Sequence, residues 1–338
     1  MGKIDLPNLV SYESLKFCHE FNGYNWEKEN IFNFTNVSTC NPFPMLIVGS
    51  AIRQARALHR NLECKASNCS NTYAETMRFY KFIGIDKGKS LDLDYGNSLY
   101  RPISDLRIEN YIEKSKILNK PLGEVITQRS RELAGLLTQG NKKFLDILTF
   151  CMREIIRNIP EHSLTKKGYY CAQYWPSTKT VEVAVLDEGS GIYNSLSSNY
   201  HYRMKINTNL DSLELAIQPG VSRTYSPNLD EEIFAGESSR WRNSGFGLHM
   251  VSRICAYSGG SFILASGEDA IHLNTDLRSD EIYQTNYKTM VNGTAIQMRL
   301  NVEALVNYKY IIERINSELK DFTIDGFKVA SSASRLLV

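Results

Sequence analysis

The sequence lacks the long hydrophobic runs, targeting signals and repeats that mark membrane, secreted and fibrous proteins. Its longest apolar stretches, such as residues 44–51, are far shorter than the roughly 20 residues of a transmembrane helix. The first residues contain no apolar signal core. Gly2 would suit N-myristoylation, but Leu6 stands where that motif has Ser or Thr. These absences predict a cytoplasmic protein with no membrane association.

An excess of charge of one sign and a pattern of paired cysteines are missing as well. Lys and Arg number 39 against 37 Asp and Glu, so a net charge of +2 gives no global field that would favour nucleic acid as a partner. The seven cysteines are odd in number and scattered, which is typical of a reducing compartment. Cys64 and Cys69, with His59 nearby, lack the second Cys/His pair of a zinc site. No metal is predicted there.

The composition is that of a globular protein, with 42% hydrophobic and 22% charged residues. At about 150 residues per domain, the 338 residues predict two domains. Residues 1–105 read as a small α/β module, in which an apolar run over residues 44–48 is expected to be a strand that leads into a helix over residues 51–62. A second helix is predicted over residues 73–82.

Residues 106–304 form the second predicted domain and show the strongest helical periodicity in the chain. Alternating apolar residues on both sides of a turn at residues 176–179 predict a hairpin. A separate C-terminal segment, residues 305–338, contains an amphipathic helix over residues 305–319 that we expect to pack on its own chain. The expected elements of the second domain are helices over residues 121–139, 142–159, 210–217 and 246–257, strands over 169–175 and 181–185, and strands over 262–265 and 294–300.

The first candidate site motif lies on the helix over residues 142–159. Glu154 and Asn158 are four residues apart and therefore share one face of that helix, and His162 follows at the same spacing. A carboxylate can orient and partly deprotonate a water molecule, and an amide oxygen suits a Mg²⁺ ion that is also held by phosphates. Alone, such a pair is more often a solvated one.

The second motif follows a predicted strand and contains Asp187, Gly189 and Gly191. At a strand end, the carboxylate of Asp187 can accept a hydrogen bond from the exocyclic amine of adenine. The two glycines would let the backbone approach the base closely. An ordinary turn after a strand would look the same in isolation.

Two further motifs complete the candidate site. Small residues expose backbone N–H groups where the helix over residues 246–257 begins, and a helix N-terminus favours anions. Arginines in the polar segment before it are candidate phosphate ligands. A threonine hydroxyl after Asn292 and Gly293 can hydrogen-bond a base. The residues concerned are Ser244, Gly245, Phe246, Gly247 and Leu248 at the helix, Arg223, Arg240 and Arg242 before it, and Thr294.

Together, and in this order, the four motifs resemble the nucleotide-binding domain of the GHKL superfamily, which includes gyrase, the heat-shock chaperone, histidine kinases and mismatch-repair ATPases. There they are the N box and the G1, G2 and G3 motifs, and the resemblance covers residues 106–302. It implies an α/β (α+β) two-layer sandwich of the Bergerat type, with an antiparallel or mixed sheet backed by helices. It also implies ATP and Mg²⁺ as cofactors and a mobile lid over residues 218–243.

The resemblance also implies roles for single residues. Glu154 would position the attacking water and Asn158 would hold Mg²⁺. Asp187 would read adenine, Thr294 would support the base, and the G2 glycines would cradle phosphates. The residues expected to contact the nucleotide are Asn158, His162, Asp187, Gly189, Gly191, Ser244, Gly245, Phe246, Gly247, Leu248 and Thr294.

Two positions depart from the pattern of the superfamily. Asn243 stands where G2 usually begins with glycine, and Pro160 lies inside the N box, where its ring should end the helix after Asn158. The stretches NIPEHS, GESSRWRNSGFGLHMVSRI and GGSFILASG look like those of stand-alone bacterial ATP-binding proteins related to histidine kinases. Some of those proteins carry an N-terminal STAS-like module, which the segment YAETMRFYKFIGI resembles.

Three functions remain open at this point. The chain could be a slow ATPase or an ATP-driven switch acting on a partner protein, a protein kinase of the histidine or anti-sigma Ser/Thr type, or a passive binder of ATP. Residues 111–148 contain no histidine, which disfavours autophosphorylation on that residue. The carboxylate of Glu154 favours turnover, since a passive binder does not need a general base. A homodimer is also expected, because dimers are common in the superfamily.

Overall fold

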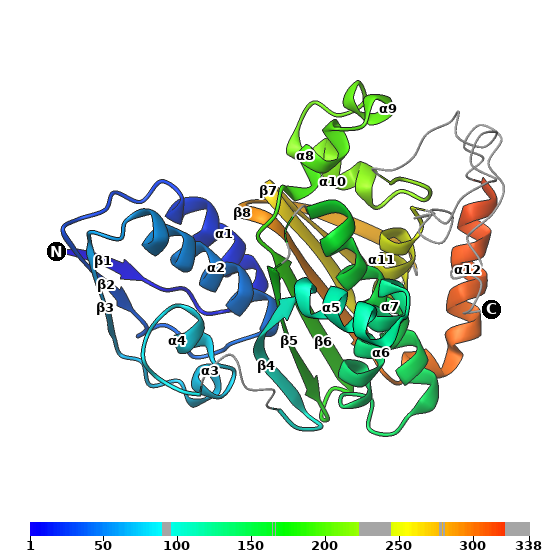
Figure 1. Cartoon of the computed structure of the whole chain (residues 1–338), viewed down its shortest axis with the longest axis horizontal. Coiled ribbons are helices and arrows are strands. Elements are labelled where there is room, and N and C mark those ends of the chain that lie inside the picture. The colour runs from blue at the N-terminus through cyan, green and yellow to red at the C-terminus, as the bar shows by residue number, and fades with distance from the viewer. Residues whose placement is uncertain are drawn as a thin grey trace.

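The computed structural model describes residues 1–89, 96–163, 165, 167–222, 245–276, 279 and 281–321, and it has an α/β fold with two separate sheets. A three-stranded parallel sheet is built from the first 70 residues and a five-stranded antiparallel sheet from the rest. Figure 1 shows the smaller sheet at one end of the molecule and helices α1 and α2 between it and the larger sheet. None of the helices in the described ranges has the length and apolar composition needed to cross a bilayer.

The N-terminal module is a β–α–β–α–β unit with its strands in the order β1-β2-β3. Consecutive parallel strands require crossover connections, and helices α1 and α2 supply them. Two short helices, α3 and α4, follow before the chain enters the larger sheet. The bounds are β1 (Gly2–Asp5), α1 (Ser11–Phe21), β2 (Glu29–Asn33), α2 (Pro42–Leu58), β3 (Glu63–Ser67), α3 (Thr72–Thr76) and α4 (Phe79–Phe82).

Two predictions for this module are wrong in detail. The apolar run over residues 44–48 is not a strand; it belongs to helix α2, which begins at Pro42. Proline is tolerated in the first turn because the N–H groups there have no partner within the helix. The single helix expected over residues 73–82 is two helices, since Arg78 between them has a left-handed backbone with φ of 63°.

The larger sheet has the strand order β4-β5-β6-β8-β7, and every neighbouring pair is antiparallel. Of the two arrangements expected, antiparallel or mixed, the larger sheet has the antiparallel one. The pairs β5–β6 and β7–β8 are hairpins, whose two strands are always antiparallel. Strand β4 also pairs antiparallel with β5, and β8 pairs antiparallel with β6. The strands are β4 (Tyr100–Arg107), β5 (Lys167–Trp175), β6 (Thr180–Asp187), β7 (Ser261–Thr275) and β8 (Ile282–Asn301).

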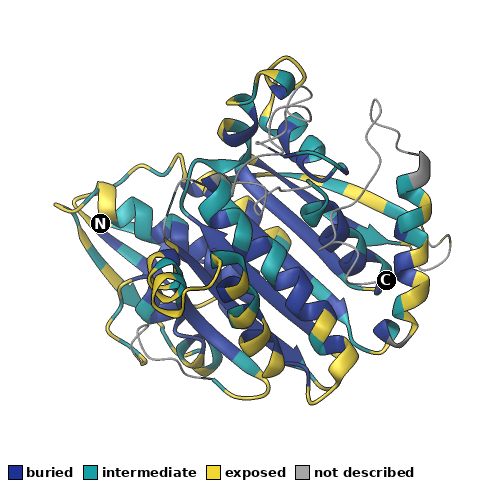
Figure 2. Ribbon diagram, turned by 45° about the vertical axis from the view of Figure 1, so that its right-hand side comes forward, coloured by how far each residue is buried: buried dark blue, intermediate teal, exposed yellow. Residues whose placement is uncertain are grey.

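Helices cover both faces of this sheet, and its side chains alternate accordingly. Tyr170 and Val183 belong to the core beneath helices α6, α7 and α11, whereas Tyr169 and Ala184, one residue away, belong to the core beneath α1 and α2. Figure 2 shows the resulting band of buried strands with exposed surfaces on the outer helices. The remaining helices are α5 (Ile108–Leu118), α6 (Leu122–Gly135), α7 (Lys142–Asn158), α8 (Gly191–Ser197), α9 (Tyr200–Arg203), α10 (Asn209–Ala216), α11 (Gly247–Tyr257) and α12 (Tyr308–Asp321).

The predicted C-terminal helix is confirmed as α12, preceded by a short 3₁₀ turn at Ala304–Asn307. Its apolar face is buried through Ile311, Ile312 and Ile315. Arg253 on α11 contacts Glu318 on α12 at 3.1 Å between Nε and Oε2. The helix therefore packs on its own chain, as its amphipathic pattern predicts.

A buried carboxylate joins helix α2 to the larger sheet. Glu182 on β6 is fully buried, and its Oε1 accepts a hydrogen bond of 3.1 Å from the N–H of Phe43 in the first turn of α2. Burial raises the pKa of this carboxyl. The first N–H groups of a helix have no intrahelical partner, so Glu182 satisfies one of them across the junction.

We expect replacement of Glu182 by alanine to lower the free energy of unfolding by about 1–3 kcal/mol, because the Phe43 N–H would stay buried without an acceptor. Glu182→Gln keeps an acceptor oxygen and is expected to remain within about 1 kcal/mol of the wild type. Urea unfolding followed by circular dichroism measures both. Equal stability of the alanine variant and the wild type would contradict the role given to this bond.

Candidate functional site

Helix α7 carries the first candidate residues and ends where the sequence predicts. Asn141 caps its N-terminus by accepting a hydrogen bond of 3.1 Å from the Phe144 N–H. The α-helix stops at Asn158, and a π-helical turn over Ile159–Ser163 follows, which contains Pro160. The prediction that proline ends the helix after Asn158 is confirmed. His162 therefore belongs to this turn and follows the end of the α-helix.

Glu154 points toward the start of helix α11. Its Oε1 forms an ion pair with Arg153, at 2.6 Å to Nη2 and 2.9 Å to Nε, and both side chains are only 15% exposed. A Cβ on Gly247 would overlap the other carboxylate oxygen, Oε2. The carboxylate therefore lies directly against the first residue of α11. Asn158 is one turn further along α7 and is half-buried.

Asp187 ends strand β6 and is 7% exposed. Its Oδ1 accepts a hydrogen bond of 2.9 Å from the Gly189 N–H, and Thr294, its partner in the β6–β8 register, hydrogen-bonds it as well. Burial raises the pKa of Asp187 to about 7, against the opposing effect of these hydrogen bonds. A buried carboxyl of this kind is held ready to exchange a hydrogen bond with a ligand near neutral pH.

The loops around Asp187 approach one another so closely that glycine is required. A Cβ on Gly293, whose φ is 99°, would overlap the carbonyl oxygen of Asp187. A Cβ on Gly189 would overlap the carbonyl oxygen of Ser163, which also accepts the Ser190 N–H at 2.8 Å. The end of the π-helical turn is thus fixed to the loop after β6.

Ser266 on β7 ties this loop to the next one. Its hydroxyl donates to the Gly293 carbonyl at 2.6 Å and accepts the Ile192 N–H at 3.0 Å. Gly191, which has a φ of 75°, lies against the same hydroxyl. The start of α8 and the turn before Thr294 are therefore held together by a single buried serine.

Gly245, with a φ of 67°, packs against the backbone of Gly220 and Val221, where a Cβ would overlap it. His249 on α11 fixes the same region, since its Nδ1 lies 3.0 Å from the Ile217 carbonyl oxygen. Burial lowers the pKa of His249 to about 4, so its ring is neutral at physiological pH and can donate this hydrogen bond from Nδ1.

The four motifs thus form a continuous chain of contacts. Glu154 on α7 meets Gly247 at the start of α11, and the π-helical turn after α7 meets the loop after β6 at Gly189. That loop meets the turn before Thr294 through Asp187, Thr294 and Gly293. Phe246 and Leu248 flank Gly247 and pack partly buried against the main core.

Several predicted site residues lie outside the described part of the chain. These are Ser244, Arg223, Arg240 and Arg242, together with Asn243 and the remainder of the predicted lid from residue 223. Residues 218–222 of that lid are described and end at the backbone contact with Gly245.

The structure also reveals residues that the motifs did not indicate. Arg153 neutralises Glu154, and Ser266 holds two loops together. Glu161 in the π-helical turn pairs with Arg157 at 2.5 Å. Burial raises the pKa of Glu161 to about 7, and the nearby charge of Glu154 adds to this effect. A charged residue next to a motif is too common a pattern to single these residues out in the sequence.

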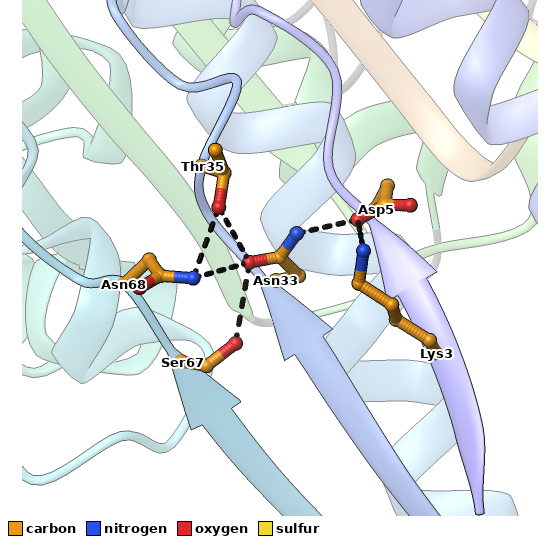
Figure 3. Close-up of polar contacts among 6 residues, drawn as sticks. All are labelled: Lys3, Asp5, Asn33, Thr35, Ser67 and Asn68. Atoms are coloured by element: carbon orange, nitrogen blue, oxygen red, sulfur yellow. Dashed lines mark hydrogen bonds and ion pairs between the residues drawn. The ribbon is translucent and has the colours of Figure 1, made fainter.

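A second polar cluster lies at the carboxyl ends of strands β1 to β3, far from the four motifs (Figure 3). At its centre, Asn33 donates to Asp5 Oδ1 at 2.5 Å, and its own Oδ1 accepts from Asn68 at 2.7 Å and from Thr35 at 2.9 Å. Ser67 adds a bond of 3.3 Å, and Lys3 pairs with Asp5 at 2.9 Å. The side-chain oxygen of Asn33 thus accepts all its hydrogen bonds from groups of the protein, so this cluster stabilises the ends of the three strands.

Comparisons with protein-family models, with curated proteins and with solved structures find nothing that matches this chain.

Proposed function

We propose that this protein binds Mg-ATP at the four connected motifs and uses it as a slow ATPase or an ATP-driven switch acting on a partner protein. In this proposal the chain contains a histidine-kinase-like ATP-binding domain of the GHKL superfamily and the Bergerat fold. The sheet β4–β8 and helices α7 and α11 would be its two layers, and the N-terminal unit would be the accessory module.

The observation that carries the proposal is the convergence of the four motifs. Glu154 and Thr294 are 140 positions apart, yet each belongs to the same chain of contacts at one end of the sheet. Four unrelated surface turns have no physical reason to meet in this way.

Each part of the nucleotide has a partner of suitable chemistry. Asp187 would accept the exocyclic amine of adenine, with Thr294 beside it. The N-terminus of α11, with Gly245 and Gly247, would favour the phosphates. Asn158 would contribute a neutral oxygen to Mg²⁺, and Glu154 would orient the water. One carboxylate oxygen of Glu154 is already paired with Arg153, and we therefore expect hydrolysis to be slow.

Isothermal titration calorimetry of the full chain with ATP, with and without Mg²⁺, tests the binding. Incubation with γ-labelled ATP and candidate proteins then tests where the phosphate goes. Label released as free phosphate supports the ATPase, whereas label on a protein would favour the alternative kinase. Absence of heat with either form of ATP would contradict the proposal.

Nucleotide affinity should depend on pH in a defined direction. With a pKa of about 7, Asp187 is protonated in about nine tenths of the molecules at pH 6 and ionised at pH 8. If the ionised form accepts the adenine amine, Mg-ATP should bind about tenfold more weakly at pH 6 than at pH 8. Calorimetry in saturating Mg²⁺, which keeps the phosphates ionised, measures this. Equal affinity at both values would argue against Asp187 as the acceptor.

A further inference from the structure

A cavity of about 110 Å³ lies between helices α1 and α2 and strand β8. We propose that this cavity binds an uncharged, flat heteroaromatic molecule with amide-like edges, and that its occupation changes the affinity for Mg-ATP. The binding half of this inference stands by itself, and the coupling half rests on the proposed nucleotide site.

The walls of the cavity are suited to a planar ring. Trp26 stacks on His59 with ring centroids 4.9 Å apart, and Phe21 meets Trp26 edge-on at 5.7 Å. Aromatic walls of this kind favour offset or edge contacts with another ring. A cavity of about 150 Å³ is known to hold benzene, so a space of this order accommodates a single ring.

The residues that line the cavity favour an uncharged ligand over a charged one. None of its described lining residues is Asp, Glu, Lys or Arg, whereas Asn22, Gln54 and Asn292 contribute amides. An ionised ligand would lose hydration there without gaining a partner of opposite charge. Asn22, Leu58 and Asn292 are exposed and form its rim, which gives a ligand access from solvent.

Gln54 has hydrogen-bonding capacity left for a ligand. Its Nε2 donates to Ser50 Oγ at 3.0 Å, and its Oε1 accepts from the Asn292 side chain at 2.5 Å. An amide group offers two donors and two acceptor positions, so one donor and one acceptor position of Gln54 remain. A ring with an amide-like edge matches this pair.

The same hydrogen bonds lead to the nucleotide motifs by two routes. Ser50 Oγ donates to Glu188 Oε1 at 2.9 Å, and Glu188 is the neighbour of Asp187 in the chain. The negative charge of Glu188 contributes to the raised pKa of Asp187. Asn292 precedes Gly293 and Thr294 directly. A ligand that reorients Gln54 therefore changes contacts on both loops that flank the proposed adenine position.

The experiment uses the full-length protein with nicotinamide and uracil as probes, which are uncharged single rings with amide groups. Benzoate is the charged control, and cyclohexanecarboxamide is the control without an aromatic ring. NMR follows the indole N–H resonance of Trp26, and Trp175, which lies on β5 outside the cavity, is the internal reference. We expect saturable binding in the millimolar range by a probe and at least tenfold weaker binding by both controls.

Two variants locate the site and the coupling. Ala51→Phe fills the cavity and should abolish probe binding. The double variant Ser50→Ala/Asn292→Ala leaves Gln54 in place and removes both routes. A saturating probe should change the Kd for Mg-ATP at least fivefold in the wild type and leave it unchanged in the double variant. If Ala51→Phe does not fold, a shift of Trp26 without a shift of Trp175 locates the probe instead.

Failure of every probe to shift Trp26, or equal binding to a folded Ala51→Phe variant, overturns the ligand site. Probe binding with an unchanged Kd for Mg-ATP overturns the coupling. A protein that binds the probes but not Mg-ATP would refute the proposed function while the ligand site stands, so the two failures are distinguishable.

Discussion

Asp187→Asn is expected to weaken Mg-ATP binding by about 10- to 150-fold. A hydrogen bond to a charged group contributes about 1.5–3 kcal/mol, and the asparagine loses the charged acceptor that the adenine amine would meet. The amide keeps an oxygen for the Gly189 N–H, so the loop after β6 should keep its conformation. Calorimetric titration of the variant at pH 8 measures the effect.

The folding of this variant can be checked independently. Because the pKa of Asp187 is raised in the folded protein, the free energy of unfolding of the wild type decreases as pH rises from about 4 to 7. At pH 8 the uncharged asparagine should therefore not lower the melting temperature. Asp269→Asn is the matched control, since Asp269 is another buried carboxylate of the same sheet and pairs with Lys288. Unchanged nucleotide affinity in Asp187→Asn, or an equal loss in Asp269→Asn, would refute the adenine assignment.

Glu154→Gln is expected to lower the rate of ATP hydrolysis by about 10²- to 10⁴-fold while the affinity for Mg-ATP changes less than about threefold. General-base assistance is of this size, and the isosteric amide cannot take the proton from water. The amide still fits against Gly247, which leaves no room for a larger group. Single-turnover phosphate release, with calorimetry on the same sample, separates the rate from the binding.

Glu161→Gln is the informative control for this prediction. Glu161 lies seven residues further along the chain than Glu154 and pairs with Arg157. Its pKa of about 7 is a value at which a carboxylate can also act as a base. We expect this variant to hydrolyse ATP within about fivefold of the wild type. A large loss in Glu161→Gln with normal turnover in Glu154→Gln would transfer the catalytic role to Glu161.

Local pattern was enough to predict the elements that carry the motifs. Helix α7 repeats apolar residues at threes and fours over four turns, and the β5–β6 hairpin alternates around its turn, so both appear close to their predicted bounds. The outer halves of β7 and β8 were missed. There the hairpin is half-exposed, with polar residues such as Gln284 and Asn286 facing solvent, and the apolar alternation disappears.

Non-local contacts are the part that the sequence could not predict. Ser50 and Glu188 are separated by 138 positions, and Phe43 and Glu182 by 139. No periodicity links such pairs, because each depends on how α2 packs on the larger sheet. The β5–β6 hairpin is predictable from local signals, whereas the sequence patterns indicate none of the three parallel strands β1 to β3. The placement of α1 and α2 against the loops of the candidate site is not predictable from such signals either.

A crystal structure of the full chain with Mg²⁺ and a non-hydrolysable ATP analogue is the most direct test of the central proposal. We predict the exocyclic amine of adenine within hydrogen-bonding distance of Asp187, Mg²⁺ on the Asn158 side-chain oxygen, and the phosphates at the N-terminus of α11. A nucleotide bound at any other place, or crystals that take up none at saturating concentration, would contradict it.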